Sequence, residues 1–218
     1  MLELELVQQI EKYFNRYQIR CAKEVHMGIG VPDLSINIGA SKSIPLLYDY
    51  YILILIEFLI NHNSISINVL MQQFPFDKQK ILSYLNQLKR DKIIYQRGNK
   101  IYIQRKVFGL NLGKTISIEA KIKDWRNGIL QAERYLMFSD YSYLALPKEK
   151  IKNVDLDYIK QKGIGLMSVD ISGINEVIQP VRSVECEYKQ KYILTSYIIK
   201  NSLNLNKRRS DDIFSKLL

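Results

Sequence analysis

The sequence has few cysteines and no long apolar run, and each shortage removes a class of protein. Its two cysteines, Cys21 and Cys186, are too few for a disulfide scaffold and are not spaced as metal ligands. Their number also excludes a four-cysteine iron–sulfur cluster within the chain. We therefore expect a reducing compartment, with an intracellular disulfide left open only for a hyperthermophilic source.

Apolar residues nowhere run far enough to cross a bilayer. The most apolar stretch, Ile44 to Ile60, contains Asp49 and Glu57 and is shorter than the roughly 20 residues of a membrane-spanning helix. The first five residues carry two glutamates where a signal peptide would have a basic segment. The expectation is a soluble, cytoplasmic protein without a membrane partner.

Acidic residues are also in short supply. The 218 residues include 32 Lys and Arg against 22 Asp and Glu, which gives a net charge of +10 and a pI near 9.4. A folded domain this basic attracts polyanions, with nucleic acid first and acidic membrane surfaces second. The chain is also long enough to bury a hydrophobic core, either as one large domain or as a core with a small module.

Apolar periodicity predicts an α/β core on both sides of a central segment. Its expected elements are a helix at 2–16, a strand at 17–25, a strand at 34–38 opened by Pro32-Asp33, a strand at 115–123, a helix from Asp124 to about Phe138, a strand at 142–146, a helix at 148–161, a strand at 163–170 and a helix from about Glu187. A basic run, Lys207-Arg208-Arg209, follows this last helix and is either a site of phosphate contacts or a frayed tail. The core is predicted to comprise residues 1–46 and 106–218.

The central segment, residues 47–105, has a different pattern. It contains helical patterns at 50–60 and 68–73, a third helix that Asp77 caps and that runs to Arg90, and two short strands around Arg97-Gly98-Asn99-Lys100. Three helices followed by a hairpin are the order of a winged helix-turn-helix. We therefore predict an inserted winged-helix module.

Two side chains on one predicted strand suggest chemistry. Glu119 and Lys121 are separated by one residue, so they point to the same face, and Asp33 opens an earlier strand. If the two strands are neighbours, two carboxylates and an ammonium group meet, as a metal site beside a phosphate site requires. The plainer interpretation is a solvated strand face and a turn residue after Pro32.

The order of these residues resembles that of a known superfamily. Pro32-Asp33, a gap, and Glu119-Ala120-Lys121 look like the PD-(D/E)XK nuclease motif in its Glu form. Gln131 and Tyr135 resemble the Q-x-x-x-Y motif of the RecB-like branch. The resemblance covers about residues 1–46 and 106–170, and the long gap departs from the short connection that members usually have.

The resemblance implies a restriction-endonuclease-like core, a mixed central sheet flanked by helices, with a defined site. Asp33 and Glu119 would bind Mg²⁺ or Mn²⁺, and Lys121 would assist the attacking water and the transition state. Gln131 and Tyr135 would hold the nucleic acid strand near the metal. Glu24 is a further acidic candidate on the preceding strand, and Glu5 or Glu11 on the first helix could serve instead.

The inserted module offers a second set of candidates. Ile81, Leu82, Leu85 and Leu88 make the expected buried stripe of its third helix. The polar and basic residues expected outward, which suit phosphate and base-edge contacts, are Lys78, Gln79, Ser83, Gln87, Lys89 and Arg90, with Arg97 and Lys100 at the wing tip. The alternative is a module used for dimerisation or packing.

Together these features predict a metal-dependent deoxyribonuclease, structure-directed or end-processing, in recombination, repair or viral replication. An enzyme like the archaeal Holliday-junction resolvases would be a homodimer, because it cuts two strands symmetrically. The main alternative is a catalytically inactive winged-helix regulator on a nuclease-like scaffold. A third hypothesis is an RNA-directed nuclease.

Overall fold

The computed structural model describes residues 2–62 and 64–202, and the basic run at 207–209 lies outside them. The chain forms two compact units, one of Met1–Ala40 with Leu112–Leu218 and one of Ser41–Asn111. The second unit is therefore wider at both ends than the segment 47–105 expected from the sequence. No helix among the described residues is long and apolar enough to cross a membrane.

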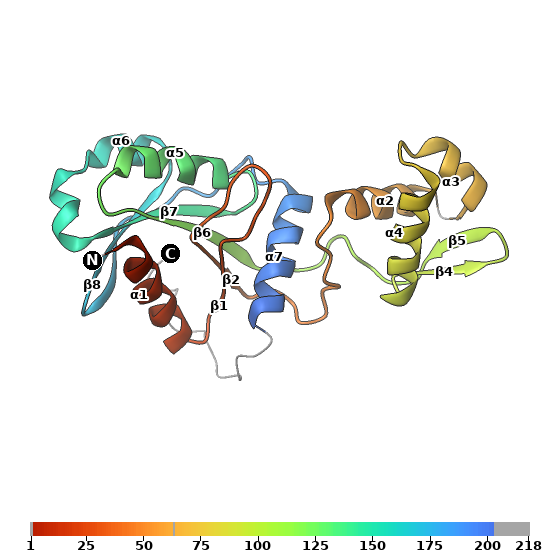
Figure 1. The fold of residues 1–218 in the computed structure, drawn as a ribbon, viewed down its shortest axis with the longest axis horizontal. Coiled ribbons are helices and arrows are strands. Elements are labelled where there is room, and N and C mark those ends of the chain that lie inside the picture. The colour runs from red at the N-terminus through yellow and green to blue at the C-terminus, as the bar shows by residue number, and fades with distance from the viewer. Residues whose placement is uncertain (1, 63, 203–218) are drawn as a thin grey trace. The chain divides into compact units, whose positions relative to one another are not determined.

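The first unit is built on a mixed six-stranded sheet (Figure 1). Its strands, in sheet order, are β1 (Arg20–Lys23), β2 (Leu34–Ile38), β6 (Lys114–Ala120), β7 (Tyr141–Pro147), β8 (Gly165–Asp170) and β9 (Gly173–Ile178). The neighbours β6, β7 and β8 run parallel, and the other pairs are antiparallel. The expected α/β class with a mixed central sheet flanked by helices is confirmed.

Helices cover both faces of this sheet. Helix α1 (Glu3–Arg16) packs on one face, where its Leu6, Ile10 and Phe14 join the apolar side chains of the strands. Helices α5 (Trp125–Tyr135) and α6 (Leu156–Gln161) supply Ile129, Ala132 and Ile159 to a second core. Since Leu144 and Leu146 of β7 belong to this second core and Tyr143 and Ala145 to the first, the strand alternates between two buried faces.

Several expected elements have different bounds. The strand expected at 17–25 is confined to β1, and the helix expected at 148–161 is a 3₁₀ helix, η1 (Lys148–Asn153), followed by α6. Strand β9, antiparallel to β8 through a turn at Ile171 and Ser172, was not foreseen. The last helix is α7 (Tyr188–Ser202), which packs against β1, β2 and β6.

The second unit has its own helices and sheet. In chain order its elements are α2 (Tyr50–Asn61), β3 (Ile65–Ser66), α3 (Ile67–Gln73), α4 (Lys78–Arg90), β4 (Ile94–Arg97) and β5 (Lys100–Ile103). The strands form an antiparallel sheet in the order β3-β5-β4. Asp77 caps α4 as expected, because its carboxylate accepts a hydrogen bond from the Lys80 N–H at 2.8 Å.

The buried stripe of α4 differs by one residue from the expected one. Ile81, Tyr84, Leu85 and Leu88 are buried, whereas Leu82 is 37% exposed. The Tyr84 hydroxyl donates a hydrogen bond to Asp49, the residue that caps α2, at 2.9 Å. A buried hydroxyl needs such a partner, and sequence periodicity does not reveal one.

Candidate active site

Glu119 and Lys121 lie at the carboxyl end of β6, the third strand of the six-stranded sheet. Glu119 is only 2% exposed, which contradicts the plainer interpretation of a solvated strand face. Helix α5 packs on this face. The Lys121 ammonium group lies 2.7 Å from Glu119 Oε1 and is the partner that a buried carboxylate requires.

Asp33 reaches the same point from the neighbouring strand. It directly precedes β2, which pairs antiparallel with β6 so that Leu34 faces Ile118. Asp33 Oδ2 accepts a hydrogen bond from the Ala120 N–H at 2.8 Å, between Glu119 and Lys121 in sequence. The structure therefore brings together three residues that the sequence separates.

The charges of the three residues affect one another. Burial raises the pKa of Glu119, and repulsion by Asp33 adds to the rise, against the opposing effects of Lys121 and Tyr135. Burial likewise raises the pKa of Asp33, with Glu3 and Glu24 adding negative charge nearby. Burial alone would lower the pKa of Lys121, but its hydrogen bond to Glu119 and the surrounding carboxylates raise it. The site thus holds a firmly protonated lysine between two carboxylates that burial makes harder to ionise.

Tyr135 contacts the site through a hydrogen bond to Glu119. Its side chain is 1% exposed, and its hydroxyl donates to Glu119 Oε2 at 2.5 Å and lies 3.1 Å from the Val31 carbonyl oxygen. Its ring packs so closely on Gly30 that a Cβ there would lie 2.7 Å from Cε1. Tyr135 was expected to hold a nucleic acid strand, and its burial instead gives it contact with the carboxylate.

Gln131 lies one turn before Tyr135 on α5. Its side chain is half-buried, and its Oε1 is buried without a hydrogen-bond partner. A buried carbonyl oxygen left unpaired costs free energy, and a bound molecule would reach this one only after the Gln131 side chain turned outward. Of the two residues in the Q-x-x-x-Y pattern, Gln131 is the one with an uncommitted polar atom.

Glu24, the additional acidic candidate, does not lie where the sequence predicted it. Glu24 follows β1 rather than lying on a strand, is exposed, and has a positive φ of 48°. Its charge acts on Asp33. Glu5 and Glu11 have other partners, the Leu2 N–H and Lys23.

Glu3 is the acidic residue that the sequence reasoning missed. Its Oε1 accepts from the Ile122 N–H at 3.4 Å, and its Oε2 lies 4.0 Å from Lys121 Nζ. Several acidic residues share the first helix, and only the packing of α1 beside the sheet selects this one. No local signal in the sequence distinguishes it.

The carboxylates of Asp33 and Glu119 supply oxygen donors of the kind that a hard divalent cation prefers. Asp33 Oδ1 has no hydrogen-bond partner in the described part of the chain, whereas both oxygens of Glu119 are bonded. Within residues 2–62 and 64–202, no three His, Cys, Asp or Glu side chains are grouped to hold a metal. Mg²⁺ usually keeps several waters and binds through one or two carboxylates, so the pair suits Mg²⁺ or Mn²⁺ and not a closed zinc site.

The remaining candidates belong to the second unit. Lys78, Gln79 and Arg90 are exposed on α4, Arg90 beside Asp91 at 3.7 Å. Lys89 is half-buried and donates to Gln96 Oε1. Two further cations, Arg97 and Lys100, are exposed and face each other across the β4–β5 hairpin.

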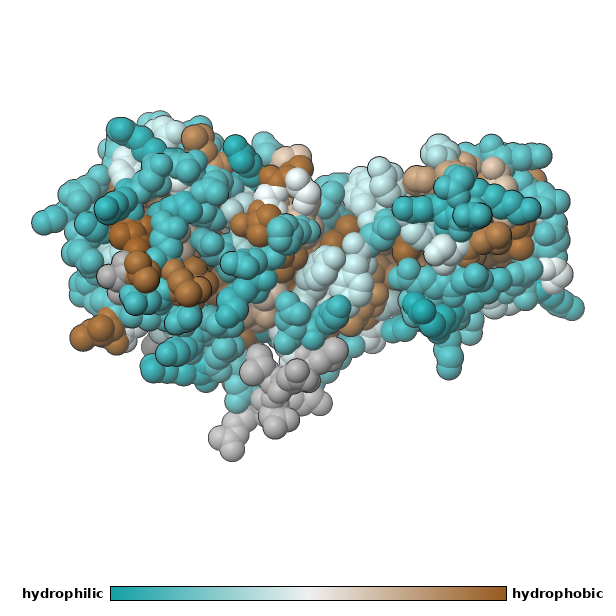
Figure 2. Space-filling view, viewed as in Figure 1, coloured by the Kyte–Doolittle hydropathy of each residue, from teal (hydrophilic) through white to brown (hydrophobic). Residues whose placement is uncertain are grey.

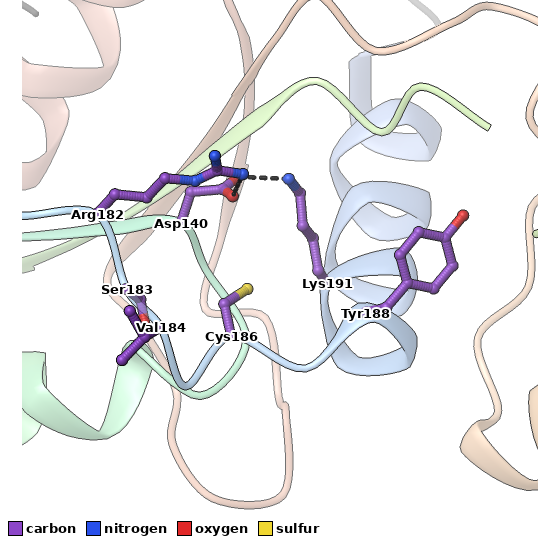
Figure 3. Close-up of a pocket in the computed structure, with 7 residues that line it drawn as sticks. All are labelled: Asp140, Arg182, Ser183, Val184, Cys186, Tyr188 and Lys191. Atoms are coloured by element: carbon purple, nitrogen blue, oxygen red, sulfur yellow. Dashed lines mark hydrogen bonds and ion pairs between the residues drawn. The ribbon is translucent and has the colours of Figure 1, made fainter. Parts of the chain in front are cut away.

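A cavity of about 410 Å³ lies elsewhere on the first unit, lined by Asp140, Arg182, Ser183, Val184, Cys186, Tyr188 and Lys191 (Figure 3). Asp140 directly precedes β7 and lies four residues before Leu144, the residue that pairs with Glu119. Its carboxylate, 4% exposed, lies 2.5 Å from Lys191 of α7 and 3.3 Å from Arg182. The cavity therefore surrounds the ion pair between Asp140 and Lys191 of α7, and it shares no residue with the site formed by Asp33, Glu119 and Lys121.

Comparison with known proteins gives no relative. No family model matches the chain, and neither the curated proteins nor the solved structures contain a match.

Proposed function

We propose that the chain is a metal-dependent deoxyribonuclease with Asp33, Glu119 and Lys121 at its active site. The observation that carries the proposal is the convergence of two carboxylates and one lysine at adjacent ends of β2 and β6. A solvated strand face would leave Glu119 exposed, whereas it is 2% exposed and hydrogen-bonded at both oxygens. Such a buried cluster costs stability, which a catalytic role explains.

Each residue has a role in phosphodiester hydrolysis. Asp33 and Glu119 would hold Mg²⁺ or Mn²⁺, which activates water and neutralises phosphate charge when bound. Lys121 is firmly protonated because its pKa is raised, so its ammonium group can hydrogen bond to a phosphate oxygen and stabilise charge that grows there. Gln131 would position the nucleotide after turning its side-chain amide outward, and Tyr135 would fix the orientation of Glu119.

The finer classification of both units belongs to the same proposal. The order α1, β1, β2, β6, α5, β7, with the cluster on β2 and β6, supports a restriction-endonuclease-like core of the PD-(D/E)XK type. In the second unit, three helices and a hairpin on a three-stranded sheet support an inserted winged helix-turn-helix. Its basic side chains on α4 and the hairpin would contact DNA.

The test is cleavage of labelled single-stranded, duplex, flapped and four-way-junction DNA with Mg²⁺, with Mn²⁺ and with EDTA. Glu119→Gln and Lys121→Met are expected to lower the rate at least about 100-fold, since each removes a group that acts on the reacting phosphate. Lys123→Met is the matched control, because Lys123 is an exposed lysine two residues beyond Lys121. Its cleavage rate should stay near that of the wild type.

The outcomes separate the alternatives within the class. Preferred cutting of the junction would indicate a resolvase and predicts a homodimer in sedimentation, whereas preferred cutting of flaps or ends would indicate end processing. A matched RNA strand cut faster than DNA would favour the RNA-directed hypothesis. Equal activity of Lys121→Met and the wild type would contradict the proposed site.

One observation favours a second function, that of a DNA-binding regulator on a nuclease-like scaffold. Lys121 and Tyr135 already satisfy both oxygens of Glu119, and no third acidic ligand completes a metal group within the described residues. This hypothesis predicts tight, sequence-specific duplex binding that persists in EDTA, with no cutting of any substrate.

A further inference from the structure

The β4–β5 hairpin of the second unit has two chemically different faces. Ile94 and Ile101 are 2% and 1% exposed, and they belong to the unit's core. The side chains that alternate with them form two cross-strand pairs, Tyr95 with Tyr102 and Arg97 with Lys100. We call these four residues the outer face of the hairpin. In the view of Figure 2, the end of the second unit that carries this hairpin is largely hydrophilic.

The two tyrosines form a flat aromatic surface. Their rings are stacked with centroids 5.0 Å apart and planes only 12° from parallel. Tyr95 stays 45% exposed in this arrangement. The pair Tyr51 and Phe76 in the same unit meets edge to face, at 78°. The outer face therefore presents a planar ring to solvent, onto which another planar ring can stack.

The two cations lie beside this ring, in a stretch of sequence that contains no acidic residue. Arg97 and Lys100 face each other in the strand register, and like charges so placed destabilise a hairpin. Residues 92–106 contain five Lys and Arg residues and no Asp or Glu. An anion held between Arg97 and Lys100 would relieve the repulsion that the hairpin otherwise carries.

The hairpin tip is also fixed in place. Gly98 adopts a φ of 59°, which a two-residue turn of the II′ type requires at its first central position. The Gln96 side chain donates to the Gly98 carbonyl at 2.8 Å and accepts from Lys89 of α4. The rings and the cations are therefore held on a braced turn, which lowers the entropy lost on binding.

We propose that the outer face of the β4–β5 hairpin binds unpaired nucleotides of DNA. A base stacks on Tyr95, and adjacent phosphates contact Arg97 and Lys100. Aromatic stacking beside a cationic path is the general mode by which proteins bind single strands, whereas bases inside a duplex offer no free ring face. The inference rests on the proposed DNA contact of the second unit and not on cleavage, and it assigns substrates with a single-stranded segment, such as flaps and frayed ends.

The test uses the full chain in EDTA, so that binding is measured without cutting. A single-stranded oligonucleotide and a blunt duplex are each labelled with 2-aminopurine, whose fluorescence reports stacking. Tyr95→Leu is expected to weaken single-strand binding roughly tenfold and to abolish the fluorescence change, because one base loses its stacking partner. Tyr95→Phe should retain both. Tyr51→Leu is the matched control, since Tyr51 is 49% exposed in the same unit.

Three results would overturn the inference: no loss of single-strand affinity in Tyr95→Leu, an equal loss on single strand and duplex, or tighter binding of an RNA strand of the same sequence. A loss confined to single strands supports it, provided that Tyr95→Leu melts at the wild-type temperature. The assay contains no metal and therefore measures binding separately from cleavage. A protein without nuclease activity can still bind single strands through Tyr95, and an active nuclease can lack this binding.

Discussion

Glu119 lies buried with Lys121 on one carboxylate oxygen and Tyr135 on the other. Its orientation is thus set by two side chains, of which Lys121 is 15% exposed and Tyr135 only 1%. We therefore regard Tyr135 as a positioning residue. Its contribution should be visible in metal dependence as well as in rate, because it acts through a proposed metal ligand.

The variant Tyr135→Phe tests this role. It removes the donor to Glu119 Oε2 and keeps the ring that packs on Gly30. We expect cleavage to fall about 10- to 100-fold, with a higher Mg²⁺ concentration needed for half-maximal rate. The measurement is a Mg²⁺ titration of the cleavage rate.

Tyr143→Phe is the matched control. Tyr143 is also 1% exposed and donates to a carboxylate, that of Glu176, at 2.5 Å, but it belongs to the core on the α1 face. Loss of the Tyr143 hydroxyl should lower the stability of the fold and leave the Mg²⁺ dependence of the cleavage rate unchanged. If both variants shift the Mg²⁺ titration equally, Tyr135 has only a general structural role.

At the residue scale, the sequence predicted that Asp33 would lie beside Glu119 and Lys121, because strand alternation places the last two on one face and the order of all three resembles a known motif. The contact of Tyr135 with Glu119 was not predictable, since it depends on how α5 packs over β6. The same is true of Glu3, which reaches Lys121 only because α1 begins beside the end of β6. Residue type and spacing carry no information on such contacts.

At the scale of elements, Asp140 connects α7 to the sheet. Its Oδ2 accepts from the Thr115 N–H at 2.8 Å and lies 2.5 Å from Lys191 of α7, which is itself 13% exposed. Burial alone would raise the pKa of Asp140, but the bonds from Lys191 and Thr115 hold it below its usual range. Arg182, 71% exposed, adds little because solvent screens it.

Asp140→Asn should therefore destabilise the first unit in a pH-dependent way. A carboxyl group whose pKa is lowered on folding stabilises the protein above its unfolded pKa, near 4, and loses that contribution as the pH falls through the folded value. We expect a loss of about 3 kcal/mol at neutral pH, because Lys191 is left buried without its partner. The difference from the wild type should shrink below about pH 4.

Urea unfolding between pH 3 and pH 7 measures this effect. Asp157→Asn is the control, since the pair of Asp157 with Lys160 is exposed on both sides and should matter little at neutral pH. A difference between Asp140→Asn and the wild type that does not change with pH would contradict the ionic explanation.

Element prediction from the sequence succeeded where periodicity was long. The helices α1, α4 and α5 and the strand β6 were foreseen from apolar spacing and from the caps Asp77 and Asp124. Strand β9 was missed because its residues are mostly half-buried, and the pattern GINEVI lacks clean alternation. Tyr84 takes the place of Leu82 in the stripe of α4 because positions 81, 84, 85 and 88 share one helix face, and its hydroxyl is bonded to Asp49 there.

At the scale of the whole molecule, the second unit is inserted between two strands that pair with each other. Ile38 at the end of β2 faces Lys114 at the start of β6, so a hairpin turn could join them. Each unit has its own core and sheet. The second unit carries ten Lys and Arg residues against four Asp and Glu.

Replacing Ser41–Asn111 with a short turn should therefore leave the first unit folded and able to cut DNA with Mg²⁺. DNA affinity should fall roughly tenfold or more, with a weaker salt dependence, because a set of phosphate contacts is lost. Thermal unfolding and binding at several salt concentrations, beside the full chain, are the measurements. A shortened protein that does not fold would show that the two units are not independent.

The insertion also bears on the order in which the chain folds. In the unfolded chain, β2 and β6 can meet only by closing a loop of roughly 70 residues, which is entropically costly and slow. The Ser41 N–H donates to the Asn111 carbonyl oxygen at 2.9 Å, so the folded second unit holds its own two ends together. If that unit folds first, β2 and β6 emerge side by side and pair as quickly as a local hairpin. The second unit would then act as a folding nucleus for the sheet that bears Asp33 and Glu119.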